Sequence, residues 1–325
     1  MTDHPEWEVP EGLRPESGDF AFDLNQALDA VVALRAEVPD DAFTASVLGT
    51  ERAGNAVLID PNGLAVTVGY LVTEAETVWL TTNDGTACAA HVVGYDFQSG
   101  MGLVQALGRL GAPHLELGDT TALREGDTLI AAGHGGRAGA LEAYLVSKRE
   151  FAGYWEYLLD EALFTAPAHP HWGGSALIGP DGTLVGVGSL LVEEARGEGR
   201  KMQGNMFMPA GLLDTVREDL LLHGRSTRPA RPWLGTYTVD TETGPVVAGL
   251  APDGPGEAAG LEAGDLVVEV AGKRVRDLTQ MIRAAWGQGD AGVEIALTLL
   301  RQGEVLRVTV QTCDRTDRLK RPRLH

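Results

Sequence analysis

The chain has 325 residues, of which 44% are hydrophobic, so it is long enough to bury a large core as two or three domains. Its formal net charge of -20 repels phosphate backbones and anionic membrane surfaces, which argues against nucleic-acid and membrane partners. The cations near the C-terminus, within residues 314–325, are expected to form a solvated and frayed basic tail. We therefore predict no nucleic acid and no membrane among the partners.

Cysteine usage and the N-terminal segment bear on the compartment. Cys88 and Cys313 lie far apart in the sequence, so neither a disulfide nor a cysteine metal site is expected. Residues 1–18 are acidic and Pro-rich and are predicted to be disordered, without the cationic segment and apolar run of a secretory signal. No stretch has the apolar length that spans a bilayer. These features predict a cytoplasmic protein.

The pattern of apolar residues predicts a mainly β body over residues 19–223. Residues 22–36 carry apolar side chains at helical spacing, which predicts one amphipathic helix ending near Pro39. From residue 42 to about 187, short apolar runs alternate with turn formers, as in the hairpins of an antiparallel barrel or sandwich. Residues 209–223 again show helical spacing, so a helix is expected to close this body.

A second domain follows a polar linker. Residues 224–232 are basic and Pro-rich with almost nothing to bury, which indicates an interdomain linker. Residues 233–313 return to alternating apolar and polar positions around a short helix near 277–286, which predicts a small α+β domain. The basic tail, residues 314–325, completes the chain.

Residues 54–72 read GNAVLIDPNGLAVTVGYLV and resemble the motif GSGVIIDxxGYILTNxHVV of the HtrA/Deg serine proteases. The resemblance implies a chymotrypsin/trypsin-like double β-barrel. Together with the motifs described in the following paragraphs, the resemblance covers roughly residues 20–312. In the enzymes the histidine of this motif is the general base. Tyr70 stands at that position here.

The other two catalytic positions also differ from those of the enzymes. The stretch that begins Val93-Gly94-Tyr95-Asp96 resembles VGxDxxxDLAVL, and Gly100 falls where the orienting aspartate stands. Residues 171–187, HWGGSALIGPDGTLVGV, resemble GNSGGPLLNxDGxVIGI, and Gly173 takes the position of the nucleophile.

A serine hydroxyl attacks only after a neighbouring imidazole, itself held by a carboxylate, removes its proton. Tyrosine, with an ordinary pKa of about 10, is a poor general base at neutral pH, and glycine at positions 100 and 173 offers no side-chain group. The sequence therefore predicts a homologue without peptide hydrolysis and with no cofactor. The backbone amides of His171 and Gly173 are predicted to be the remains of an oxyanion hole.

The second domain resembles the PDZ domain of the same family. Residues 231–236, RPWLGT, resemble the loop that binds a ligand's terminal carboxylate, and residues 254–265, GPGEAAGLEAGD, resemble SPAAxAGLxxGD. The resemblance implies that a peptide adds a strand beside this loop. The predicted peptide-binding residues are Trp233, Leu234, Gly235 and Thr236 in the loop, with Met281, Ile282 and Ala285 on the opposite helix.

Two functional interpretations, a relocated nucleophile and a zinc site, compete with simple loss of the catalytic site. Ser175 could be a relocated nucleophile beside His169 and His171, although side chains this close in sequence rarely converge on one attacking geometry. The same two histidines could begin a zinc site, for which His91, His114 or His134 could supply a third ligand. Ordinary loop residues are favoured in both cases, so no metal is predicted, and Trp172 is expected to plug the former active-site entrance.

The predicted function is binding of peptides or protein C-termini by the PDZ domain, with the degenerate protease body as scaffold. Regulator, adaptor and chaperone-like roles stay open, with active proteases or client proteins as partners. The resemblance also implies a homo-oligomer, as a trimer, to which Phe20 and Phe22 could contribute. The first alternative is a serine-type hydrolase with a rearranged site at Ser175 or Tyr70. A further alternative is a structural protein whose groove is closed by its own tail, residues 314–325.

Overall fold

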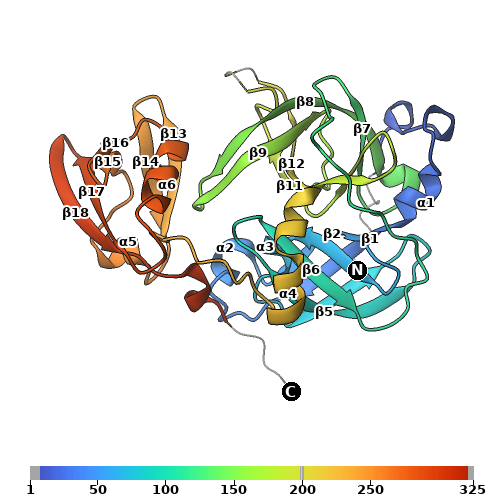
Figure 1. Ribbon diagram of the computed structural model, residues 1–325, viewed down its shortest axis with the longest axis horizontal. Helices are drawn as coiled ribbons and strands as arrows, with labels where there is room; N and C mark the ends of the chain where they lie inside the picture. The colour runs from blue at the N-terminus through green and yellow to red at the C-terminus, as the bar shows by residue number, and fades with distance from the viewer. Residues whose placement is uncertain (1–7, 198, 200, 321–325) are drawn as a thin grey trace. The chain divides into compact units, whose positions relative to one another are not determined.

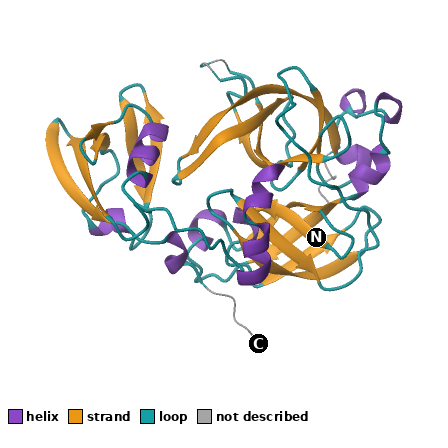
Figure 2. Cartoon of the chain, in the orientation of Figure 1, coloured by secondary structure: helices purple, strands orange, loops and turns teal. Residues whose placement is uncertain are grey.

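The computed structural model describes residues 8–197, 199 and 201–320, which divide into two compact units (Figures 1 and 2). The first unit runs to Arg149, resumes over Glu161–Ser226 and takes in Lys320. The second consists of Glu150–Asp160 and Thr227–Leu319. Strands, orange in Figure 2, dominate both units, which confirms the mainly β prediction.

The first unit contains two closed antiparallel barrels (Figure 1). The first barrel has the strand order β1 (Val31–Glu37), β2 (Glu51–Leu58), β3 (Leu64–Val68), β6 (Met101–Ala106), β5 (Ala87–Tyr95) and β4 (Thr77–Thr81). The second has the order β10 (Ala176–Ile178), β11 (Leu184–Val192), β12 (Gly204–Pro209), β9 (Tyr157–Ala166), β8 (Ala140–Gly153) and β7 (Thr128–Ala132). Closure pairs every strand on both sides, so neither barrel has a free edge.

Turn chemistry and apolar side chains fix the barrels locally. Asp60 Oδ1 accepts from the amides of Asn62 (2.8 Å) and Leu64 (3.0 Å), which closes the β2–β3 hairpin as an Asx turn. Fully buried leucines such as Leu34 and Leu80 fill the first barrel. The second barrel encloses a separate apolar cluster of Leu123, Leu129, Ala131, Ala143, Leu145, Leu163, Leu177, Val185 and Phe207.

The helices of the first unit are all short. They are η1 (Glu11–Leu13), η2 (Ser17–Asp19), α1 (Leu24–Asp29), α2 (Ala45–Leu48), α3 (Gly69–Val72), η3 (Gly136–Gly139), η4 (Ala210–Thr215) and α4 (Arg217–His223). The expected closing helix over residues 209–223 is present as η4 followed by α4.

The prediction of one helix over residues 22–36 is wrong. Helix α1 ends at Asp29, and the chain continues at once as strand β1. The β-branched pair Val31 and Val32 pairs with β2, and strand β1 also pairs with β4. Pairing on both edges outweighs the local helical spacing, because β-branched residues suit a doubly paired, buried strand.

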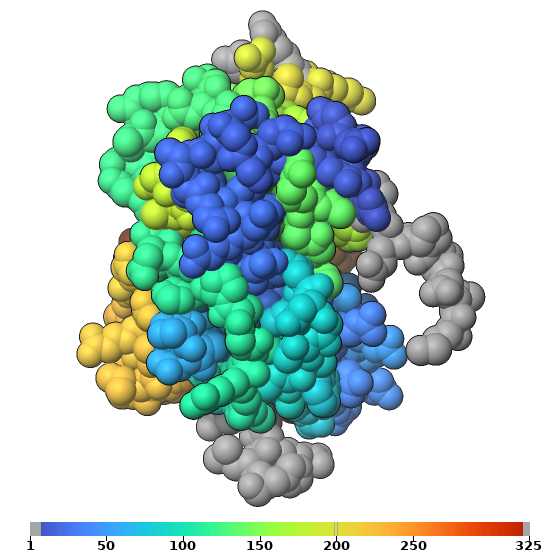
Figure 3. Space-filling view, turned by 90° about the vertical axis from the view of Figure 1, so that its right-hand side faces the viewer, coloured from blue at the N-terminus to red at the C-terminus, as the bar shows by residue number. Residues whose placement is uncertain are grey.

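The N-terminal segment is also more ordered than expected. Val9 is fully buried, its amide donates to Ala138 O at 2.8 Å, and Arg137 pairs with Glu16 at 3.0 Å. Figure 3 shows the segment in blue beside green residues of the second barrel. Disorder is therefore the wrong description for residues 8–18, and residues 1–7 lie outside the described part of the chain.

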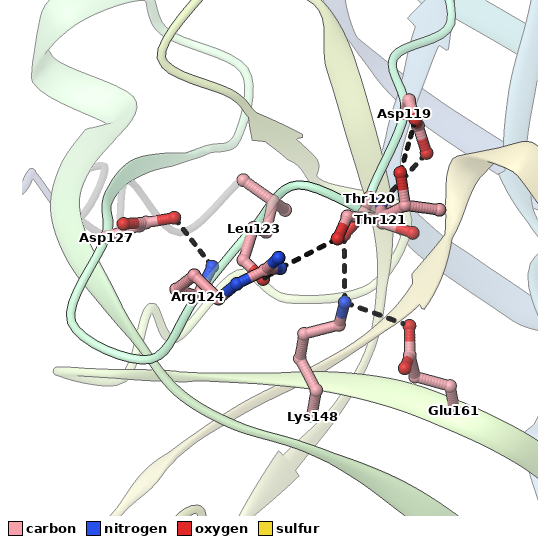
Figure 4. Close-up of polar contacts among 8 residues, drawn as sticks. All are labelled: Asp119, Thr120, Thr121, Leu123, Arg124, Asp127, Lys148 and Glu161. Carbon is pink, nitrogen blue, oxygen red and sulfur yellow. Dashed lines mark hydrogen bonds and ion pairs between the residues drawn. The ribbon is translucent and has the colours of Figure 1, made fainter.

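A polar cluster fastens the loop between β6 and β7 to the base of the β8–β9 ribbon (Figure 4). Lys148 on β8 donates to Thr120 O at 2.9 Å and pairs with Glu161 on β9 at 3.3 Å. Within the loop, Arg124 donates to Thr121 O at 2.8 Å. These bonds fix the ribbon where it leaves the barrel.

The second unit has a sheet of order β13 (Thr236–Thr241), β14 (Gly244–Leu250), β15 (Leu266–Val270), β17 (Glu294–Arg301) and β18 (Glu304–Gln311), with β16 (Lys273–Arg274) paired to β15. Its helices are α5 (Pro255–Ala258), α6 (Leu278–Trp286) and η5 (Arg315–Arg318). Asp277 caps the expected helix α6 by accepting from Gln280 N at 2.7 Å. This unit has the α+β composition predicted for residues 233–313.

The C-terminal tail is ordered as far as it is described. Residues 315–318 form η5, Leu319 is 9% exposed, and Lys320 N donates to Glu74 Oε1 at 2.6 Å. The prediction of a frayed tail is therefore wrong for residues 314–320, because backbone bonds and burial hold them. None of the helices over the described residues has the length and apolar character that crossing a membrane requires.

Candidate functional site

The loop that carries Gly173 is tied down by Asn55 on β2. Asn55 Nδ2 donates to His171 O at 3.0 Å and to Gly173 O at 3.1 Å, and its backbone amide donates to Gly173 O at 2.8 Å. Asn55 Oδ1 accepts from His134 N at 2.8 Å. The HtrA/Deg motif has a serine at this position. Its replacement by the longer asparagine is a sequence signal that could have predicted these side-chain bonds.

The two positions expected for base and nucleophile lie side by side. The hydroxyl of Tyr70, on α3, donates to Ser189 O at 2.9 Å. A Cβ atom built on Gly173 would lie 3.1 Å from the Tyr70 hydroxyl oxygen. Burial raises the pKa of Tyr70 well above its ordinary value, so the hydroxyl keeps its proton and donates a hydrogen bond instead of accepting a substrate's proton.

The third position, Gly100, lies beside the same helix. Gly100 O accepts from Gly69 N at 2.8 Å, one residue before Tyr70. Gly100 has a left-handed φ of +77° in the turn between β5 and β6, a conformation that glycine adopts without steric cost. The fold thus brings Tyr70, Gly100 and Gly173 together without a carboxylate, an imidazole or a serine hydroxyl among them.

A buried arginine, which no sequence pattern indicated, supports the helix that carries Tyr70. Arg52, 5% exposed, donates to Tyr70 O at 2.7 Å, to Thr73 O at 2.9 Å and to Thr44 Oγ1 at 2.8 Å. Burial lowers the pKa of Arg52, and the nearby charge of Glu74 opposes that shift. Arg52 therefore holds the backbone of the helix that presents the Tyr70 side chain.

His169 is a structural residue of the loop. It is fully buried, its Nδ1 accepts from His171 N at 3.1 Å, and its Nε2 lies 2.9 Å from Gly139 O. Since a carbonyl can only accept, Nε2 carries the proton. The amide of His171, one of the two predicted oxyanion donors, is thus already bonded to the His169 ring.

Ser175 is enclosed by its own loop. Its residue is fully buried and its Oγ donates to Trp172 O at 2.9 Å. Trp172 is half-buried, and whether it closes an entrance stays a prediction. No three His, Cys, Asp or Glu side chains gather as a metal-binding group within the described residues, including the histidines weighed as zinc ligands.

The predicted carboxylate-binding loop of the second unit does hold a carboxylate. The amide of Leu234 donates to Glu156 Oε2 and that of Thr236 to Glu156 Oε1, both at 2.8 Å. Gly235 between them has a φ of +75°, and a Cβ there would lie 2.9 Å from the Pro255 side chain. The backbone amide of Trp233 donates to Cys313 O at 3.2 Å instead.

The three helix residues expected to line a pocket lie in the apolar core. Met281, Ile282 and Ala285 are at most 2% exposed and belong to one cluster with Leu158 and Leu234. Glu156 and Leu158 come from a distant part of the chain, so no local sequence signal pointed to them.

Comparisons with known proteins agree with both units. The family described as "Trypsin-like peptidase domain" matches residues 54–187, and that described as "PDZ domain" matches residues 232–312. Periplasmic serine endoprotease DegP of Salmonella typhimurium is 25% identical over 274 residues, which is 79% of this chain and 56% of DegP. Periplasmic pH-dependent serine endoprotease DegQ of Escherichia coli is 24% identical, over 88% of this chain and 68% of DegQ.

The chain is a homologue of the DegP/HtrA serine proteases. The fold agrees with solved members: the HtrA-type protease AlgW with decapeptide superposes with a TM-score of 0.52 at 20% identity, covering 92% of this chain and 98% of AlgW. The serine endoprotease from Yersinia pestis gives 0.51 at 21% identity, covering 90% of this chain and 98% of the other. The trypsin-like double barrel followed by a PDZ domain is thereby confirmed.

Two further facts follow for this HtrA homologue. Its matched region spans little more than half the length of the DegP proteins, 56% for the Salmonella protein. The prediction of a cytoplasmic protein is wrong, because these relatives are periplasmic endoproteases. Composition failed here because it reports what a chain lacks and does not identify its compartment.

The buried His169 predicts an acid-sensitive fold for this HtrA homologue. Burial lowers the pKa of His169 to about 4 from an ordinary 6.5, so the unfolded chain takes up a proton at a higher pH than the folded chain. The free energy of unfolding should therefore fall by up to about 3 kcal/mol as pH drops from about 6.5 to about 4. Chemical denaturation across this range measures the fall.

The variant His169→Gln should show a smaller fall than wild type over the same pH range, since glutamine does not titrate. The exposed neighbour supplies the control, and His171→Gln should retain most of the wild-type fall, because it leaves the buried imidazole in place. An identical pH dependence in wild type and His169→Gln would contradict the role of the buried imidazole.

Proposed function

We propose that this HtrA homologue does not hydrolyse peptides and acts by binding peptides or protein C-termini through its PDZ domain, with the trypsin-like body as scaffold. One observation carries the proposal: the Tyr70 hydroxyl, bonded to Ser189 O at 2.9 Å, lies 3.1 Å from the point where a Cβ on Gly173 would stand. A protonated phenol therefore fills the space in which the base and the nucleophile of an active enzyme would meet.

Chemistry supports the loss of turnover. Acyl transfer needs a nucleophile, a base within hydrogen-bond reach of it and a group that orients the base. Gly173 and Gly100 supply no such group, and burial raises the pKa of Tyr70, which keeps its proton in place. The amide of His171 is bonded to the His169 ring at 3.1 Å, so one oxyanion donor is also engaged.

The binding half of the proposal rests on the PDZ loop. Two amides two residues apart, those of Leu234 and Thr236, converge on one carboxylate at 2.8 Å each. Charge-assisted bonds of this kind are the strong ones, and a terminal carboxylate of a peptide offers the same acceptor. The adjacent strand β13 is an edge strand of its sheet and can take a further strand.

A hydrolase built on Ser175 is the second candidate, and the geometry weighs against it. Ser175 is fully buried and donates its hydroxyl to Trp172 O at 2.9 Å, so it faces its own loop. Regulator, adaptor and chaperone-like roles, a trimeric assembly, and active proteases or client proteins as partners belong to the same proposal.

Casein hydrolysis and labelling by a fluorophosphonate probe test the proposal, with an active HtrA-type protease as positive control. We expect no turnover above buffer and no label, for wild type and for Ser175→Ala alike. Peptides with a free C-terminal carboxylate should bind, and their amidated forms should not. Turnover or label that disappears in Ser175→Ala would establish the hydrolase instead.

A further inference from the structure

The tip of the β8–β9 hairpin packs in the same unit as the PDZ sheet. Residues 150–160 are grouped with residues 227–319, whereas the remainder of β8 and β9 belongs to the second barrel. The tip is rich in aromatic residues: the Trp155 and Tyr157 rings stack at 5.6 Å, and the Tyr154 ring lies 6.0 Å from that of Tyr237 on β13. A preformed, rigid segment of this kind can act as a ligand at low entropic cost.

The carboxylate of Glu156 occupies the acceptor position of the PDZ loop. Its two oxygens accept from the amides of Leu234 and Thr236, and the Thr236 hydroxyl lies 3.3 Å from Oε1. Glu156 also has a left-handed φ of +61°, which costs a non-glycine residue free energy. A costly backbone conformation that directs a carboxylate into this loop is maintained only because the surrounding contacts fix it.

A backbone hydrogen bond joins the tip to the groove strand β13. Thr238 N donates to Tyr154 O at 2.8 Å. Arg315 adds a bond to Trp155 O at 3.1 Å. The tip is therefore bonded to β13, the edge strand at which a peptide would add by β-augmentation.

Side chains on both sides of the tip anchor it to helix α6. Leu158, 8% exposed, lies in the apolar cluster with Met281 and Ile282. Arg283 donates to Asp160 Oδ1 at 2.5 Å and to Glu150 Oε2 at 2.9 Å, one carboxylate from each strand of the hairpin. Strand, loop and helix of the groove are thus all in contact with residues 150–160.

We propose that residues 150–160 are a built-in ligand of the PDZ groove, with the Glu156 carboxylate in the place of a peptide's terminal carboxylate, so that a partner's C-terminus binds by displacing the hairpin tip. This inference rests on the proposed peptide-binding function. The C-terminal tail, residues 314–325, is the occupant that the sequence suggested, but the loop amides are bonded to Glu156 instead.

The test uses the full chain and one defined probe. The probe is a fluorescein-labelled peptide with the sequence of residues 148–155 followed by a leucine, which supplies a free α-carboxylate and an apolar side chain. Its amidated form is the negative control. Fluorescence anisotropy gives the dissociation constant for wild type, for Glu156→Ala and for Glu142→Ala, a β8 residue outside the hairpin tip.

Removing the internal carboxylate should lower the dissociation constant of the probe at least about tenfold, because a competitor for the same amides is lost. Glu142→Ala should bind as wild type does, and the amidated probe should not bind. Equal affinity for wild type and Glu156→Ala would overturn the built-in ligand and leave the peptide-binding function intact.

Hydrogen exchange separates the two hypotheses if no protein binds the probe. In wild type the amides of Leu234, Thr236 and Thr238 should be protected, and in Glu156→Ala the first two should exchange at least about tenfold faster. Faster exchange without probe binding would support the docked hairpin and contradict the proposed function. Unchanged exchange would overturn the docked hairpin itself.

Discussion

Gly174→Ala is expected to lower the free energy of unfolding by about 3–5 kcal/mol. Gly174 has a φ of +73°, and a Cβ there would lie 1.9 Å from Asn55 O and 2.5 Å from Thr67 Oγ1. Both are held, since the Thr67 hydroxyl donates to that same carbonyl at 2.7 Å. The loop that carries Gly173 must therefore shift to admit a methyl group. Thermal unfolding should show a fall in Tm of about 10 °C.

Gly111→Ala is the matched control for the backbone component. Gly111 has a similar φ of +68°, but nothing lies within 4 Å of a Cβ placed there. Gly111→Ala should lower the free energy of unfolding by only about 1–2 kcal/mol, which reflects the left-handed conformation alone. Equal destabilisation by the two variants would mean that the contact with Asn55 O does not constrain the loop.

Arg52→Met is expected to lower the free energy of unfolding by about 3–5 kcal/mol. The guanidinium donates hydrogen bonds to the backbone carbonyls of Gly49, Tyr70 and Thr73 and to the hydroxyl of Thr44. Methionine fills part of the volume but satisfies none of these acceptors, and it removes the charge that faces Glu74. Buried acceptors without donors carry the full desolvation cost. Urea denaturation measures the loss.

Arg35→Met provides the comparison on a neighbouring strand, because Arg35 lies exposed on β1. A surface change of this kind should stay within about 0.5 kcal/mol of wild type. If Arg52→Met were as mild as Arg35→Met, the buried network would contribute little to the position of α3 and of Tyr70.

The sequence by itself determined the class of fold and located the positions that correspond to the catalytic residues of the resembling enzymes. Short apolar runs separated by turn formers indicate antiparallel strands. This pattern is local, because the alternation of side chains along a strand appears in neighbouring residues of the sequence. The motif around Tyr70 and the one around Gly173 carried the resemblance, and the identity of the residues at those positions does not depend on the fold. The loop from Leu234 to Thr236 was also located by its local pattern.

Only the tertiary structure decided how distant segments meet. Strand β1 replaced the predicted helix because pairing with β2 and β4 is a long-range effect, and residues 8–18 are held by contacts with the second barrel. Nothing near Glu156 in the sequence marks it as a partner of Leu234, 78 residues away. Such contacts depend on where the folded chain places each segment, and local propensity carries no record of that placement.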